Sequence, residues 1–144
     1  MPSVYTTIDI AASTERVWAV LTCLDEYGRW NPFLRSARGW LEPGAPLDVC
    51  IAVGSRSATV GVRVLRVDPS VELRWRGPRS SLLRRVLAGE HYFLLEKSAI
   101  GCRLVHGETF TGAAAGVLIP PLLPQLRRAY IAMNDALKRT AETS

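Results

Sequence analysis

The chain has 144 residues, of which 48% are hydrophobic and 22% are charged, and its formal net charge is +5. This length suits one domain whose hydrophobic core needs neither disulfides nor a structural metal. Sixteen of the 18 basic residues are arginines, but they are spread along the chain without a basic block or an aromatic-interleaved RNA motif. The composition therefore argues against nucleic-acid binding.

Cysteine usage and the N-terminus bear on the cellular compartment. Cys23, Cys50 and Cys102 are odd in number and far apart, and no CxxC or Cys/His ligand spacing accompanies them. They indicate neither a disulfide framework nor a zinc site. The first ten residues lack the pattern of a signal peptide, and no apolar run approaches the roughly 18 residues of a membrane span. We therefore expect a soluble, cytoplasmic protein with no integral membrane association.

The first 33 residues predict one strand and two short helices. Residues 4–10 alternate as a strand does. Ser13 is a candidate N-cap and Glu15 places negative charge in the first turn, so a short helix should follow through Leu21. Residues 24–30 suit one or two further helical turns, ended by the Trp30-Asn31-Pro32-Phe33 stretch because a residue before proline avoids the helical region.

The middle of the chain reads as an antiparallel sheet. Alternating apolar residues predict half-buried strands at 47–53, 60–65 and 71–76, and a weaker pattern indicates a strand at 36–41. Short connections rich in Gly, Pro, Asp and Ser separate them and imply antiparallel neighbours. Residues 77–88 interrupt the pattern and suit a loop with one helical turn. Two more strands are expected at 89–97 and 101–110.

A long amphipathic helix of about 20 residues is predicted from Leu122, within the stretch that ends at Glu142. One face carries apolar residues at helical spacing: Leu122, Leu126, Ala129, Tyr130, Met133, Ala136 and Leu137. The opposite face is charged: Arg127, Arg128, Asp135, Lys138 and Arg139. About 20 residues of helix span about 30 Å, so a broad surface must cover the apolar face. The α+β order of elements suggests a curved sheet wrapped around this helix, with a cavity between them.

Several sequence phrases, in this order and spacing, resemble the START/Bet v 1-like (SRPBCC) superfamily, specifically its bacterial polyketide cyclase/dehydrase and lipid-transport type. They are residues 12–18 (ASTERVW), 30–33 (WNPF), 72–77 (ELRWRG), 89–93 (GEHYF), 103–112 (RLVHGETFTG) and 133–138 (MNDALK). The resemblance spans 1–144 as one domain and implies a helix-grip fold: about seven antiparallel strands grip the C-terminal helix around a deep apolar cavity. It leaves the chemistry open, because the superfamily includes carriers, cyclases and ligand binders.

Three titratable residues are the candidate catalytic groups. Side chains two apart on a strand share a face, so His91 should lie beside Phe93 on one inward face, and His106 and Glu108 beside Phe110 on the next. One hypothesis is acid/base chemistry, with Glu108 accepting a proton and His106 or His91 donating one. The alternative, which we weight above it, is that these buried groups satisfy one another's hydrogen bonds. A metal site from this trio lacks further ligands at suitable spacing.

The candidate ligand-binding wall is aromatic and aliphatic. Its members are Trp30, Pro32, Phe33, Trp75, Phe93, Phe110, Leu122, Leu126, Tyr130 and Met133. Each of them is equally suited to ordinary core packing. Asn134, next to this wall, is a candidate for a hydrogen bond to neighbouring backbone. The irregular segment 113–123, with its prolines, suits a gate.

Arg79, Arg84 and Arg85 suit a solvated loop or, alternatively, a site for an anionic ligand, an acidic carrier protein or lipid headgroups. Nucleotide-binding and GxSxG motifs are absent, so no cofactor is expected. The sequence favours binding of a small hydrophobic molecule: a polyketide, a lipid or an aromatic metabolite. The alternatives are a cofactor-independent cyclase, aromatase or dehydratase, and an interaction protein with a vestigial cavity.

Overall fold

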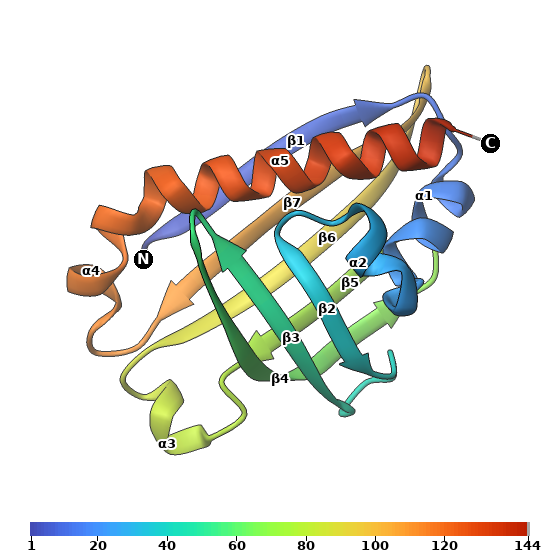
Figure 1. The fold of residues 1–144 in the computed structure, drawn as a ribbon. Coiled ribbons are helices and arrows are strands. Elements are labelled where there is room, and N and C mark those ends of the chain that lie inside the picture. Colours follow the sequence, from blue (N-terminus) through green and yellow to red (C-terminus); the bar gives the residue numbers. More distant parts are fainter. Residues whose placement is uncertain (144) are drawn as a thin grey trace.

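A seven-stranded antiparallel sheet forms most of the molecule, in a computed structural model that describes residues 1–143 (Figure 1). The spatial order is β1-β7-β6-β5-β4-β3-β2, so only β1 lies out of chain order. The strands are β1 (Ser3–Ile10), β2 (Leu34–Gly39), β3 (Pro46–Val53), β4 (Arg56–Asp68), β5 (Glu72–Gly77), β6 (Ala88–Ser98) and β7 (Gly101–Thr111). Short turns connect most of them, as antiparallel neighbours allow.

Short helices occupy the connections, and one long helix ends the chain. They are α1 (Thr14–Thr22), η1 (Leu24–Glu26), α2 (Tyr27–Trp30), α3 (Ser81–Arg84), α4 (Ala115–Leu118), η2 (Pro120–Leu122) and α5 (Leu123–Glu142). Ser13 caps α1 as predicted, because its side chain accepts a hydrogen bond from the backbone amide of Arg16 at 3.0 Å. In the region described, no helix is both long and apolar enough to cross a bilayer.

Helix α5 lies along the concave side of the sheet, next to β1 and β7 (Figure 1). On its apolar face Tyr130, Met133 and Leu137 are fully buried and Leu126 and Ala129 are half-buried, whereas Arg128 and Asp135 are exposed. Burial of this stripe against the sheet holds the helix in place, since propensity alone stabilises an isolated helix only marginally. The predicted helix-grip arrangement is confirmed.

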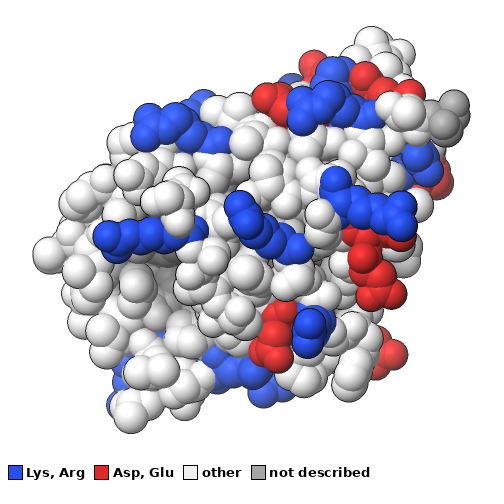
Figure 2. Space-filling view, in the orientation of Figure 1, with Lys and Arg blue, Asp and Glu red and all other residues white. Residues whose placement is uncertain are grey.

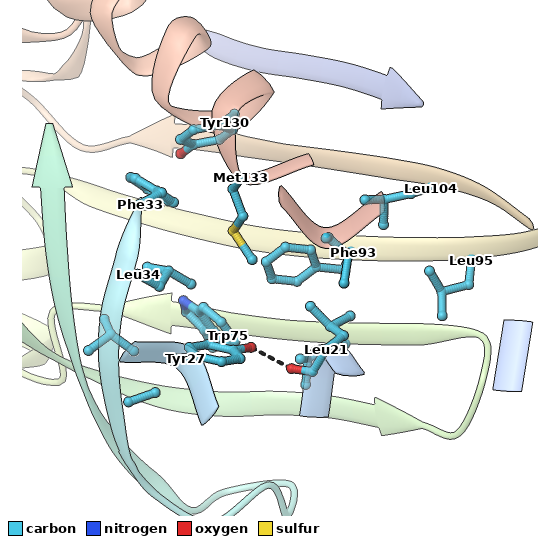
Figure 3. Packing of buried hydrophobic residues seen from close by; sticks show 14 of the residues in the cluster. Leu21, Tyr27, Phe33, Leu34, Trp75, Phe93, Leu95, Leu104, Tyr130 and Met133 are labelled. Atoms are coloured by element: carbon cyan, nitrogen blue, oxygen red, sulfur yellow. Dashed lines mark hydrogen bonds between the residues drawn. The ribbon is translucent and has the colours of Figure 1, made fainter. Parts of the chain in front are cut away.

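The inward faces of β6 and β7 are also as predicted. His91 and Phe93 on β6, and Leu104, His106 and Phe110 on β7, are at least nine-tenths buried. The register sets them opposite one another, because His91 pairs with Glu108 and Phe93 pairs with His106. Figure 3 shows Phe93 among the core residues between the sheet and Met133 of α5.

Two strand boundaries differ from the prediction. The strand expected at 36–41 ends at Gly39, whose φ of +135° turns the backbone away and leaves Trp40 exposed. The strand expected at 60–65 is the centre of the longer β4, which pairs with β3 from Arg56 onward and carries an irregularity between Val64 and Arg66. Propensity missed the polar start of β4 because pairing to β3 determines it.

Candidate functional site

An apolar cavity of about 230 Å³ lies on the inner side of β3 to β7. Its wall consists of Leu34, Ile51, Val60, Val62, Trp75, Gly77, Pro78, Leu87, Gly89, His91, Glu108 and Phe110. The surface is hollowed on the side where the β3–β4 hairpin, the start of α5 and the α3 segment surround the ends of β6 and β7 (Figure 2). Among residues 1–143, His91 and Glu108 are the only titratable residues that line this cavity.

Glu108 and His91 are hydrogen-bonded to each other and to Tyr130. Glu108 Oε1 lies 3.2 Å from His91 Nδ1 and accepts a hydrogen bond from Tyr130 Oη. The other nitrogen of His91, Nε2, lies 2.7 Å from His106 Nε2. Both ring nitrogens of His91 are therefore engaged by the protein.

The chain of hydrogen bonds continues behind His106 to the first strand. His106 Nδ1 lies 2.8 Å from Asn134 Oδ1 on α5, and Asn134 Nδ2 donates to Thr6 Oγ1 at 2.8 Å. Thr6 Oγ1 in turn donates to the backbone oxygen of His106 at 2.7 Å. Thr6, His106 and Asn134 are all at least nine-tenths buried, and each finds the partner that a buried polar group requires.

This series of hydrogen bonds determines which ring nitrogens of His91 and His106 carry a proton. The Asn134 amide donates to Thr6, so its oxygen must accept, and His106 Nδ1 carries a proton. Neutral His106 then accepts at Nε2, which requires a proton on His91 Nε2. A hydrogen bond between His91 Nδ1 and Glu108 needs one further proton, located on either partner. Either His91 Nδ1 or the Glu108 carboxyl can therefore be the donor in this contact.

Burial keeps His106 and Tyr130, which contact the Glu108–His91 pair, in their neutral forms. Desolvation lowers the pKa of His106 well below its ordinary value, and the nearby His91 charge lowers it further, whereas the hydrogen bond that His106 donates to Asn134 raises it. Desolvation also raises the pKa of Tyr130 well above its ordinary value, and the charge of Glu108 raises it further. The Tyr130 hydroxyl therefore remains a hydrogen-bond donor to Glu108.

Aromatic rings hold both imidazoles in place. The ring of His91 stacks between Trp75, at a centroid distance of 5.4 Å, and Phe33, at 5.9 Å. The ring of His106 stacks between Phe93 at 4.4 Å and Tyr130 at 4.5 Å. Such stacks restrict rotation of the imidazole rings and thereby preserve the hydrogen bonds of His91 and His106.

Glu108 Oε2 is the atom that the protein leaves available to a ligand. It makes no hydrogen bond to residues 1–143, and it is not among the fully buried atoms that lack a partner. It lies over Gly89 of the adjacent strand, where an added Cβ would collide with it. A glycine at this position therefore leaves room for the carboxylate at the cavity wall.

The other sequence candidates fall into separate groups. Trp75 and Phe110 line the cavity with His91 and Glu108, whereas His106 lies behind them and does not reach the wall. The remaining candidates are placed as follows: Phe33, Phe93, Tyr130 and Met133 in the fully buried core, Trp30 beside α1, Pro32 exposed, and Leu122 and Leu126 in a groove against the β3–β4 hairpin.

Sequence reasoning missed two members of the hydrogen-bonded chain. Thr6 shares the inward face of β1 with Val4 and Ile10, and its two-residue spacing from them was the available signal. Asn134 was expected to bond to nearby backbone, but it joins Thr6 to His106 instead. Its position four residues after Tyr130 already placed it on the buried face of the helix.

The lowered pKa of His106 predicts acid sensitivity. Below the ordinary histidine pKa of 6.5, the unfolded chain binds a proton that the folded protein refuses, so the free energy of unfolding falls as the pH falls. The expected slope from this residue is at most about 1.4 kcal/mol per pH unit. Urea unfolding between pH 7.5 and pH 5 should show this slope in the native protein and a shallower one in His106→Gln. An equal dependence of the free energy of unfolding on pH in the two proteins would contradict a lowered His106 pKa in the folded state.

Comparisons with known proteins agree with the fold. A family model described as "Polyketide cyclase / dehydrase and lipid transport" matches residues 1–142. Among solved structures, the Zhui aromatase/cyclase from Streptomyces sp. R1128 is similar, with a TM-score of 0.77, 20% identity, and coverage of 98% of this chain and 93% of that chain.

Two further structures share the fold at lower identity. Protein MLL2253 from Mesorhizobium loti has a TM-score of 0.76 at 15% identity, and Ara h 8.0201 has 0.73 at 10% identity; each alignment covers 99% of both chains. The search of curated proteins found no significant match. Identities this low show the fold alone, but the family model spans nearly the whole sequence. The chain therefore belongs to the polyketide cyclase/dehydrase and lipid transport family.

Proposed function

We propose that this protein binds a small hydrophobic molecule in the cavity on the inner side of its sheet, with Glu108 Oε2 orienting a polar atom of the ligand. The observation that carries the proposal is a wall that is apolar apart from His91 and Glu108, with one carboxylate oxygen that lacks a protein partner. Ligand sites combine these two features: apolar surface supplies affinity, and a few placed polar groups fix orientation. The existence of the cavity also counts against the vestigial alternative.

The cavity volume limits the ligand. An engineered protein cavity of about 150 Å³ holds benzene, so about 230 Å³ accommodates one substituted aromatic ring or a small bicyclic compound. Drug-sized ligands usually occupy about 300–1,000 Å³. A longer polyketide or acyl chain must therefore extend out through the hollow or widen the site.

Native mass spectrometry of the protein purified from its own cells tests this proposal. A retained hydrophobic molecule of one or two rings is the expected result, and Val60→Trp, which places an indole on the cavity wall, should abolish retention. Thr59→Trp is the matched control, since Thr59 is the adjacent, exposed residue of β4 and does not line the cavity. An empty native protein that also fails to bind a broad library of aromatic probes would refute the proposal.

A second candidate function is cyclase or dehydratase chemistry, and the hydrogen-bond contact between Glu108 and His91 at the cavity wall favours it. Glu108 Oε2 can remove a proton from a carbon flanked by carbonyls; that carbon then bonds to a second carbonyl carbon, and the protonated Glu108 returns the proton to the oxygen. Atoms and charge balance without a cofactor. Because both His91 nitrogens are engaged, His91 and His106 act through Glu108 rather than on the substrate.

The cytoplasmic location expected from the cysteines remains part of the proposal. Cys23, Cys50 and Cys102 are all free thiols in the structure, which is the usual state in a reducing compartment. An acidic carrier protein that delivers a tethered substrate is a partner that this second function would admit.

A further inference from the structure

One end of the molecule exposes bulky aliphatic side chains on three short segments. They belong to α3 and its C-terminal flank, to α4 and to η2, and each is between 45% and 77% exposed: Leu82, Leu83, Val86, Val117, Leu118 and Leu122. We call these six residues the apolar rim. Single exposed aliphatics are common on proteins, but a group of six at one end marks an interaction surface.

Backbone hydrogen bonds join the first two segments into one surface. The amide of Ala113 donates to the Arg85 oxygen, and that of Ala114 donates to the Val86 oxygen, each at 2.9 Å. Helices α3 and α4 consequently lie at the same end of the molecule (Figure 1). Pro78 and Leu87, which flank α3 in the chain, line the cavity. The apolar rim is therefore next to the cavity.

The surroundings of the apolar rim are basic. Residues 49–67, 73–89 and 109–134, which include all six residues of the apolar rim, contain no Asp or Glu. Arg84, Arg85, Arg127 and Arg128 have no carboxylate within ion-pair distance among residues 1–143. Acidic side chains gather toward the opposite end of the face in Figure 2. Arg79 differs, because it pairs with Asp48 at 3.0 Å and serves the structure.

Carboxylates from neighbouring strands do not cancel this charge. Glu90 lies on the outer face of the sheet and pairs with Arg74 at 2.8 Å, and Glu108 is directed into the cavity. The surface thus combines protruding aliphatic side chains with uncompensated arginines. Peripheral membrane binding needs these two signals together, apolar insertion and attraction to anionic lipid.

We propose that the apolar rim docks on an anionic membrane surface, with its Leu and Val side chains at the headgroup boundary and the arginines against lipid phosphates. A bilayer accepts protruding aliphatics on separate turns in any arrangement, whereas an acidic protein would need a hollow matched to each of them. Docking would bring the cavity end against the membrane. The proposal stands independently of the proposed function, because docking is measured without a cavity ligand.

Sedimentation with lipid vesicles tests this docking. The native protein should bind vesicles of phosphatidylcholine with 30% phosphatidylserine at least tenfold more tightly than vesicles of phosphatidylcholine alone, and 0.5 M NaCl should remove most of that difference. Absence of binding to the anionic vesicles at low salt would overturn the proposal. Binding of a purified acidic carrier protein to this surface, without any binding to vesicles, would also overturn the proposal.

Matched variants show whether vesicle binding depends on the apolar rim and its arginines or on exposed aliphatic and basic residues in general. Val117→Ser/Leu118→Ser should weaken binding to anionic vesicles at least tenfold, whereas Val71→Ser/Ile100→Ser, exposed aliphatics on turns elsewhere, should leave it within twofold. Arg85→Gln/Arg128→Gln should weaken binding more than Arg38→Gln/Arg103→Gln, which removes the same charge from other exposed positions. Equal losses within either pair would overturn the proposal. Unchanged thermal unfolding midpoints verify that the variants fold.

Discussion

Glu108→Gln is expected to lower turnover of a short linear β-polyketone by about 100- to 10,000-fold, the usual contribution of a general acid/base, while ligand affinity changes less than threefold. The amide keeps the shape of the carboxylate and can still accept the Tyr130 hydrogen bond. It cannot take up a proton from carbon. The measurement is single-turnover formation of cyclised or dehydrated product, with affinity determined separately.

Glu90→Gln is the matched control for this experiment. Glu90 lies on β6 one residue before His91, but on the outer face of the sheet, where it pairs with Arg74. Its replacement should leave turnover within twofold of the native protein. If Glu108→Gln also stays within threefold, acid/base catalysis at this site is excluded. A native protein that binds the probe without converting it would leave ligand binding as the function.

Asn134→Ala is expected to lower the free energy of unfolding by about 2–4 kcal/mol. The truncation removes the hydrogen bonds to His106 and Thr6, and it leaves the buried Nδ1–H of His106 without an acceptor. An unsatisfied buried donor costs about 1–3 kcal/mol, and the lost hydrogen bond to Thr6 adds about 1 kcal/mol. Urea unfolding at pH 7.5 measures the change.

Asp135→Ala provides the comparison, because this neighbour is exposed and its replacement should stay within about 0.5 kcal/mol. Imidazole ¹⁵N chemical shifts give a second readout that a loss of packing alone would not produce. The native protein should show the proton of His106 on Nδ1, and Asn134→Ala should release that preference. A stability change below 1 kcal/mol, or an unaltered tautomer, would contradict the proton assignment.

The secondary structure was largely predictable because it depends on local periodicity. The alternation in β6 and β7 placed His91, His106 and Glu108 on inward faces, and helical spacing assigned Tyr130 and Met133 to the buried face of α5. Predictions were poorer where one residue acts through backbone geometry, as at Gly39, or where strand pairing extends a polar segment, as at the start of β4.

The roles of the candidate site residues were much less predictable. Phe93 and Phe110 both face inward, but the first packs against His106 and the second lines the cavity. Trp30 ends α2, and Pro32 and Phe33 follow it, yet of these three only Phe33 packs against the imidazoles. An inward direction is a property of the strand, whereas contact with open space depends on the curvature of the whole sheet.

The sequence by itself therefore determined the order of the elements, the face on which each side chain lies and the pairing of a long helix with a sheet, because these follow from periods of 2 and 3.6 residues. Tertiary structure alone decided that Thr6 meets Asn134, 128 residues later, and that these two orient His106. It also decided that Glu108, not either histidine, offers the cavity a free atom. Contacts between distant segments depend on strand register and sheet curvature, which no local pattern encodes.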